Sequence, residues 1–205
     1  MKFGLNGWQL NAVDEARCEH EVELRQIPAI DELTGLANYQ GLSETVETEI
    51  KRSKRSGRDF AMLVFDLNGM KQINGRLGHL AGDRALCRLA HIFRFSCRLI
   101  DTAARYGDDK FAVILPESGA SAAEIVERRI CDRLSADRVE PLLSVSVGIA
   151  VSPADGKTLV TLFQAAVCAL DKRIERAEDT VTYSGFLPFV ISKQESVPAP
   201  TEVDS

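Results

Sequence analysis

Two short apolar runs, each meeting aspartate at one end, most constrain how this chain can fold. The first covers Phe60–Phe65 and stops at Asp66, and the second covers Phe111–Leu115 directly after an acidic turn at Gly107–Lys110. Apolar runs of this length that are bounded by turn residues are typical of buried β-strands. If the two strands are neighbours, Asp66 lies close to the aspartates of the turn. Carboxylates placed in this way are the oxygen ligands that Mg²⁺ prefers when it also holds nucleotide phosphates.

The rest of the pattern predicts helices packed on a sheet. Helices are expected at Leu42–Ser56 with Ser43 as N-cap, in a short stretch within Gly69–Asp83 that ends in a glycine-punctuated loop, and at Arg84–Ile100, Gly119–Leu134 and Thr158–Ala177. Further strands are expected at Ala103–Tyr106 and Leu142–Val151, with an edge strand at Val181–Tyr183. This order of elements favours an α+β sandwich.

The two ends of the chain differ in character from its middle. A weak helical pattern from Trp8 to Gln26 is stopped by Pro28, so residues 1–30 are interpreted as an N-terminal helix or linker. Residues 31–185 are expected to form one domain. The prolines and acids near the C-terminus predict a disordered tail over residues 186–205.

Composition narrows the classes of function. A net charge of −5 argues against a general DNA-binding protein, which usually carries a basic excess. The five cysteines have no paired spacing, so neither a disulfide framework nor a zinc site is expected. The chain has neither an apolar run long enough to span a membrane nor a signal-peptide pattern. A soluble, cytoplasmic protein is expected.

Four motifs in register resemble the GGDEF domain of diguanylate cyclases. They are D-E-L-T-G-L-A-N from Asp31, F-D-L-N-G-M-K-Q-I-N from Phe65, R-Y-G-D-D-K-F from Arg105 and S-V-G-I-A-V-S-P-A-D-G from Ser146. The resemblance covers about Asp31–Ala177. It implies the cyclase-palm, ferredoxin-like fold, in which helices surround a central, mostly antiparallel sheet. It also implies an activity: two GTP-loaded domains meet and, with Mg²⁺ or Mn²⁺, convert two GTP molecules to cyclic di-GMP.

The resemblance assigns roles by position. The family's metal ligands correspond to Asp66, the carbonyl of Leu67, and Asp109, which with position 110 also forms the catalytic part of the turn. The family's nucleotide contacts correspond to Lys71, Asn74, Asp83, Gly107, Asp108 and Arg173. Asn74 and Asp83 resemble the pair that reads the guanine edge, which suits an amide and a carboxylate. Helix capping or turn formation is the alternative for these two residues.

Two departures from the family pattern lie in the signature turn. Asp108 replaces a glycine, which adds a Cβ atom and a negative charge where the family brings backbone close to a triphosphate. Lys110 replaces an acid, and an ammonium there competes with the metal ion. We expect weak GTP binding and little or no catalysis. The alternative, that Lys110 only pairs with Asp108 or Asp109, predicts the same loss.

Further departures weaken the nucleotide contacts. Asn68, Gly75 and Tyr39 replace an aspartate, an aspartate and an arginine of the family pattern. In the last helix Arg173 corresponds to a phosphate-binding lysine, but the glycine-arginine pair that follows in the family is displaced. The phosphate contacts are therefore expected to be only partly kept.

One regulatory feature of the family matches by position. Arg98 and Asp101 form an R-x-x-D pattern ahead of the signature turn, where active relatives bind cyclic di-GMP as an inhibitor. Arginine can donate two parallel hydrogen bonds to guanine, and aspartate can accept one from it. The same pattern recurs at Arg105, Arg129 and Arg176, so only position favours Arg98. A surface ion pair is the alternative.

These patterns support one hypothesis and one alternative. The hypothesis is a degenerate, non-catalytic GGDEF domain that acts as a cyclic di-GMP receptor or as a module for dimerisation with itself or with a partner signalling protein. The alternative is a weakly active diguanylate cyclase. Mg²⁺ or Mn²⁺ is expected only if GTP is bound.

Overall fold

A four-stranded sheet forms the centre of the molecule. The computed structural model describes residues 29–179. Within them the strands are β1 (Phe60–Leu67), β2 (Thr102–Arg105), β3 (Lys110–Leu115) and β4 (Val145–Ser152), in the spatial order β2-β3-β1-β4. Each pair of neighbouring strands is antiparallel. The expected mostly antiparallel α+β fold is therefore confirmed.

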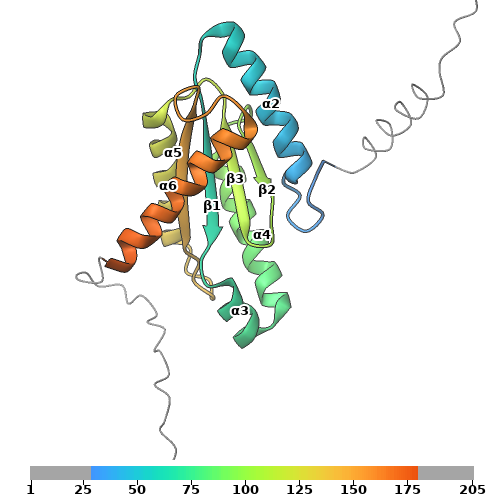
Figure 1. The fold of residues 1–205 in the computed structure, drawn as a ribbon. Coiled ribbons are helices and arrows are strands. Elements are labelled where there is room, and N and C mark those ends of the chain that lie inside the picture. The colour runs from blue at the N-terminus through green and yellow to red at the C-terminus, as the bar shows by residue number, and fades with distance from the viewer. Residues whose placement is uncertain (1–28, 180–205) are drawn as a thin grey trace, which may run out of the picture.

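Helices cover both faces of the sheet (Figure 1). They are α2 (Tyr39–Ser56), α3 (Met70–Leu77), α4 (His79–Ser96), α5 (Ala120–Ala136) and α6 (Leu159–Asp179). The core on one face of the sheet is shared with α4 and α5, and the core on the other face is shared with α2 and α6. The short helix α3 follows the end of β1 and leads into α4 (Figure 1).

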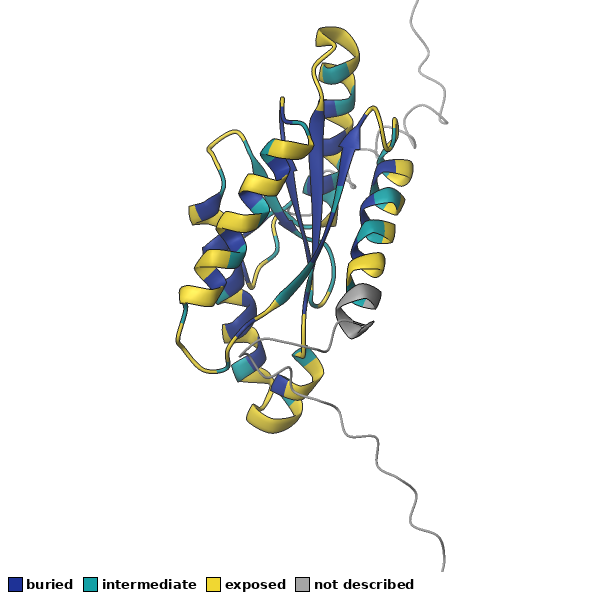
Figure 2. Cartoon of the chain, turned by 90° about the vertical axis from the view of Figure 1, so that its left-hand side faces the viewer, coloured by how far each residue is buried: buried dark blue, intermediate teal, exposed yellow. Residues whose placement is uncertain are grey.

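Burial on both faces explains why β1 is almost continuously apolar. Leu63 and Phe65 belong to the core under α4 and α5, whereas Met62 and Val64 belong to the core under α2 and α6. A strand in this position needs apolar side chains on both faces instead of alternating apolar and polar ones. Figure 2 shows the buried sheet between helices whose outer surfaces are exposed. The only β1 side chain that is not buried is that of Asp66, near the end of the strand.

Gly148 sets the distance between β4 and α6. A Cβ atom on Gly148 would lie 2.0 Å from the Ala166 carbonyl oxygen and 2.6 Å from the Leu170 backbone nitrogen. Because both neighbours are backbone atoms of α6, no side-chain rotation could relieve the contact. Helix α6 therefore lies closer to β4 than any larger residue at position 148 would allow.

The structure corrects the predicted start of two helices. Helix α2 begins at Tyr39, and its N-cap is Asn38, whose side chain accepts a hydrogen bond from the Gly41 N–H, so the assignment of Ser43 as N-cap was wrong. Helix α4 begins at His79, five residues before the expected Arg84, because Gly82 lies inside the helix.

Several expectations fall outside the described residues. They are the helix at Trp8–Gln26, the edge strand at Val181–Tyr183 and the tail over residues 186–205. Among the helices of residues 29–179, none combines the length and apolar character that crossing a membrane requires.

Candidate functional site

The end of β1 and the turn between β2 and β3 form one site. In the antiparallel register of β1 and β3, Asp66 is directly opposite Lys110. The Leu67 N–H donates a 3.0 Å hydrogen bond to the Asp109 carbonyl oxygen, which fixes the turn against the end of β1. The structure therefore brings the residues expected to bind metal close together, as the two apolar runs predicted.

An ion pair joins the two opposing residues. The Lys110 ammonium nitrogen lies 2.7 Å from Oδ2 of Asp66, and the two side chains are 48% and 27% exposed. The hydrogen bond to Asp66 raises the pKa of Lys110, and the negative charges of Asp109 and Asp171 contribute in the same direction. The alternative in which Lys110 pairs with Asp108 or Asp109 was therefore wrong about the partner, because the register of β1 and β3 places Lys110 opposite Asp66.

This pair decides how well the site suits a divalent metal ion. Asp66, Asp109 and the Leu67 carbonyl supply oxygen donors, which Mg²⁺ prefers. One Asp66 oxygen, Oδ2, is already bonded to the Lys110 ammonium group, however. A divalent cation would therefore have to compete with this ammonium group for the Asp66 carboxylate.

The signature turn is held by Arg105. Its guanidinium donates a 2.8 Å hydrogen bond to the Asp108 carbonyl oxygen and pairs with Asp31 at 3.2 Å. Gly107 and Asp108 follow Tyr106, and neither has a positive φ. Gly107 is not among the described glycines with positive φ, and Glu117 is the one described non-glycine residue that has one. Asp108 thus fits the turn without backbone strain. Only its added bulk and negative charge remain as reasons to expect weaker nucleotide binding.

Asp31 is fixed by several hydrogen bonds. The Thr34 N–H and hydroxyl both donate to Oδ1, at 2.8 and 2.6 Å. Burial acts to raise the pKa of Asp31, but the bonds from Thr34 and the charge of Arg105 outweigh it and lower the pKa below its ordinary value. The Asp31–Arg105 pair therefore connects the turn before α2 to the signature turn.

The expected guanine-reading residues lie at the α3–α4 junction. Oδ1 of Asn74 is buried and has no hydrogen-bond partner in the described part of the chain. It packs against Gly82, where a Cβ atom would lie only 2.0 Å away. Asp83 is exposed on α4, one residue after Gly82, and Lys71 is exposed on α3. Since the Asn74 amide caps no helix here, capping does not account for its side chain.

Arg173 is occupied by other contacts. Its guanidinium pairs with Glu127 of α5 and donates a 3.4 Å hydrogen bond to the Val147 carbonyl oxygen of β4. Because α5 and α6 lie on opposite faces of the sheet, Arg173 reaches around the edge strand β4. A phosphate could be bound by this guanidinium only if the pair with Glu127 opened.

Arg98 and Asp101 line a separate pocket of about 480 Å³ beside the N-terminal turn. Oδ2 of Asp101 accepts a 2.7 Å hydrogen bond from the Arg98 backbone N–H, so the carboxylate orders the backbone of this turn. The alternative for these two residues was a surface ion pair between their side chains. No such ion pair is found among the described residues. Oδ1 of Asp101 is buried and makes no hydrogen bond to the described residues.

The structure adds Arg129 to this pocket's surroundings. Burial raises the pKa of Asp101, and the Arg98 backbone N–H and the charges of Arg98 and Arg129 oppose that rise. Arg129 also donates a 2.9 Å hydrogen bond to the Ser96 carbonyl oxygen at the end of α4. Sequence reasoning missed Arg129 as a contributor here, because only the packing of α5 beside α4 brings it close to Asp101.

An antiparallel sheet that carries carboxylates and an acidic turn at one end, with helices on both faces, defines a palm-type fold. The chain belongs to the GGDEF domain family: residues 28–179 match the family model described as diguanylate cyclase, GGDEF domain. The resemblance inferred from the four motifs is thereby confirmed.

The comparisons also identify individual relatives. The chain is 38% identical over 140 residues to the bifunctional diguanylate cyclase/cyclic di-GMP phosphodiesterase MucR of Pseudomonas aeruginosa, a match that covers 66% of this chain and 20% of that protein. The chain spans only about a fifth of the length of the first curated relatives that it matches, with coverage of 20%, 17% and 21%.

Solved structures share the fold. The diguanylate cyclase SiaD of P. aeruginosa, in complex with its activator SiaC, has a TM-score of 0.68 at 27% identity, covering 80% of this chain and 65% of SiaD. The coiled coil and GGDEF domain of DgcB from Caulobacter crescentus, in complex with c-di-GMP, has a TM-score of 0.67 at 25% identity, covering 80% of this chain and 90% of that one.

Proposed function

We propose that this chain is a non-catalytic GGDEF domain that acts in bacterial cyclic di-GMP signalling as a receptor for the dinucleotide. The observation that carries the loss of catalysis is the 2.7 Å ion pair between Lys110 and Asp66. It neutralises a carboxylate that metal-dependent phosphoryl transfer requires, and it places a fixed cation where a metal would need to bind. The cytoplasm, where cyclic di-GMP is made from GTP, is the compartment in which this role would be exercised.

The pocket of Arg98 and Asp101 supports the receptor part of the proposal. Arg98 is exposed, and no hydrogen bond occupies its guanidinium within the described residues. Arg129 contributes a second positive charge beside Asp101. Two guanidinium groups and one carboxylate suit a ligand that carries guanine edges and two phosphates. A structural relative, DgcB, was solved in complex with c-di-GMP.

Isothermal titration with cyclic di-GMP tests this proposal. We expect micromolar binding without metal and its loss in Arg98→Ala. The matched control is Arg138→Ala, which removes an exposed arginine that does not line the pocket and should leave binding unchanged. If the unmodified chain releases no heat with cyclic di-GMP, or if Arg98→Ala binds as well as the unmodified chain, the receptor proposal is wrong.

A weak diguanylate cyclase is the second candidate, and Asn74 is the observation that favours it. Its Oδ1 lies beside Gly82 and has no hydrogen-bond partner in residues 29–179, which supports a role for this amide in contacting a nucleotide. Such an enzyme would convert GTP to cyclic di-GMP with Mg²⁺ or Mn²⁺ and would lose that activity in Asp66→Ala. If the unmodified chain is inactive, the double variant Asp108→Gly with Lys110→Glu asks whether the turn alone blocks turnover. Restored activity would show that it does, and continued inactivity would implicate the contacts of Arg173.

If neither cyclic di-GMP nor GTP binds, the remaining proposal is that the chain is a module for dimerisation or for binding a partner protein. SiaD, a structural relative, was solved in complex with its activator SiaC, so a protein that contains this fold has a protein partner. Light scattering of the purified chain would show whether it forms the homodimer that we expect for this reading.

A further inference from the structure

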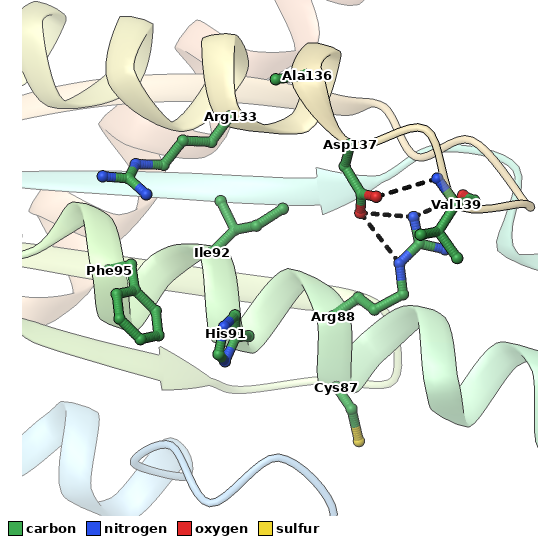
Figure 3. Close-up of a pocket in the computed structure, with 9 residues that line it drawn as sticks. All are labelled: Cys87, Arg88, His91, Ile92, Phe95, Arg133, Ala136, Asp137 and Val139. Carbon is green, nitrogen blue, oxygen red and sulfur yellow. Dashed lines mark hydrogen bonds and ion pairs between the residues drawn. The ribbon is translucent and has the colours of Figure 1, made fainter.

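A groove runs between α4 and α5 on the face of the molecule that carries neither α2 nor α6. Two adjoining hollows of about 770 and 490 Å³ share Arg133 and Ala136. The larger hollow is lined by His91, Ile92 and Phe95 of α4, as Figure 3 shows. The residues from Ile125 to Ala136 follow α5 for about 16 Å at the rise of an α-helix. This length is enough to seat about three turns of another helix.

The groove exposes large apolar side chains. Phe95 is 60% exposed, Ile125 57% and Val139 58%, although all three line it. The Phe95 ring packs against the His91 ring, with centroids 4.4 Å apart. On ordinary protein surfaces exposed apolar residues are scattered singly. Apolar side chains that gather along one groove therefore usually mark a binding surface.

The charge of the groove is positive within an acidic protein. Arg88 is neutralised by Asp137, to which it donates two hydrogen bonds of 3.1 and 2.6 Å (Figure 3). The three arginines of α5 that line the groove, Arg128, Arg129 and Arg133, are all exposed, and Asp132 is the one other acid in its lining. An occupant with apolar anchors and a net negative charge fits this surface best.

We infer that the occupant is the chain's own N-terminal stretch, residues 8–26. This stretch carries five carboxylates and two arginines, a net charge of −3, and has apolar residues at Leu10, Val13, Val22 and Leu24. The stretch therefore has both properties that suit the groove. Its apolar side chains can pack against Phe95 and Ile125, and its carboxylates can pair with the arginines of α5.

Connectivity permits this docking. The Cys87 thiol, at the rim of the groove, donates a 3.3 Å hydrogen bond to the Leu33 carbonyl oxygen. Ala29, the first described residue, is four residues before Leu33, so covalent geometry keeps the two within about 15 Å of each other. Gln26, the last residue of this stretch, is only three residues before Ala29, so the stretch can reach the groove, and attachment to the same chain raises its effective concentration there.

Tryptophan fluorescence of the full chain gives a direct readout, because Trp8 is the only tryptophan in the sequence. If residues 8–26 are docked, Trp8 emission lies at shorter wavelength than in the unfolded chain. Phe95→Ala or Arg133→Glu should shift it toward the unfolded value, and added salt should do the same in the unmodified chain, since salt screens the charges. Arg55→Glu makes the same charge change on the exposed end of α2 and should shift nothing. Circular dichroism checks that each variant is folded.

Cysteine cross-linking locates the docked segment. Cys18 lies within residues 8–26, and Cys87 and Cys168 are both exposed, on α4 and α6 respectively. Because these two helices cover opposite faces of the sheet, Cys168 is an internal control. A short bifunctional maleimide should join Cys18 to Cys87 within one chain several times more often than Cys18 to Cys168, and Arg133→Glu should remove this preference.

Each other outcome overturns the inference. Trp8 emission equal to that of the unfolded chain, or unchanged in both groove variants, would show that the segment is not docked. Equal cross-linking of Cys18 to Cys87 and Cys168 would show that it has no preferred position. Cross-links that join two chains would assign the groove to a second copy of this protein instead.

Discussion

Lys110 occupies the position where a single residue most changes what the site can do. It faces Asp66 across the β1–β3 pair, and its ammonium group binds the carboxylate at 2.7 Å. Since both side chains are partly exposed, the pair stabilises the fold by no more than about 1 kcal/mol. Its main consequence is therefore for ligand binding, where a tethered cation and a free divalent ion compete for one carboxylate.

Replacing Lys110 should expose this competition. In Lys110→Glu, two carboxylates face each other across the strands, so we expect a lower melting temperature in EDTA and a rise when Mg²⁺ is added. The melting temperature of the unmodified chain should not respond to Mg²⁺. Lys110→Gln is the control, because it removes the cation without adding an acid. A Lys110→Glu variant that ignores Mg²⁺ would show that Asp66 and Asp109 do not form a metal site.

Gly148 offers a prediction about stability. In Gly148→Ala the new Cβ atom would meet two backbone atoms of α6, the nearer at 2.0 Å, so the helix must move away from β4. We expect a loss of about 1–3 kcal/mol in the free energy of unfolding, measured by urea titration. Gly75→Ala on α3 is the matched control: its Cβ atom would meet nothing within 4 Å, and it should stabilise the helix by up to about 1 kcal/mol. Equal effects of the two substitutions would contradict this account.

Among the elements, the start of α2 shows where local sequence signals mislead. Ser43 and Asn38 are both good N-cap residues, and only the structure shows that Asn38 is the cap and that the helix begins at Tyr39. Asn38→Ala should therefore cost about 1 kcal/mol of unfolding free energy, whereas Ser43→Ala should change it by less than about 0.5 kcal/mol. Urea titration of both variants checks this. A larger loss from Ser43→Ala would place the functional cap inside the helix.

The elements were predictable where one signal dominated. The apolar runs of β1 and β3 predicted buried strands. In an antiparallel pair the end of β1 lies beside the start of β3, so adjacency of the two strands was enough to place Asp66 beside the signature turn. The start of α4 was missed because Gly78 and Gly82 both suggest a loop, whereas Gly82 lies within the helix and makes room for Asn74. A glycine needed for close packing cannot be told from a loop glycine by sequence alone.

In the whole molecule, the contacts that could not be predicted join residues far apart in the chain. The pairs Lys110–Asp66 and Arg173–Glu127 depend on strand register and on which helices flank the edge strand β4. Arg129 approaches Asp101 only because α5 packs beside α4. Motif order fixed the family and the general location of the site, but the partner of each charged side chain is a property of the packed fold.

Two ion pairs that join separate elements make the fold sensitive to acid. Asp31 pairs with Arg105 of β2, and Asp137, after α5, pairs with Arg88 of α4. Hydrogen bonds from Arg88 and from the Val139 N–H lower the pKa of Asp137, and the pKa of Asp31 is lowered as well. A carboxyl whose folded pKa is depressed binds protons more readily when unfolded, so its contribution to stability is present above its unfolded pKa of about 4 and is lost as pH falls through the lower folded value.

The free energy of unfolding should therefore fall between about pH 5 and pH 2, and part of this fall should be absent in Asp137→Asn, which cannot lose a proton there. The variant should be less stable than the unmodified chain at pH 7, and the difference should shrink as the pH is lowered. Asp132→Asn, which changes an exposed carboxylate on α5, the helix that Asp137 follows, is the control for removing a negative charge from this region. Urea titrations at a series of pH values measure all three proteins. A constant difference between Asp137→Asn and the unmodified chain would mean that Asp137 acts through packing and hydrogen-bond geometry, because a contribution from its negative charge must disappear once the carboxyl is protonated.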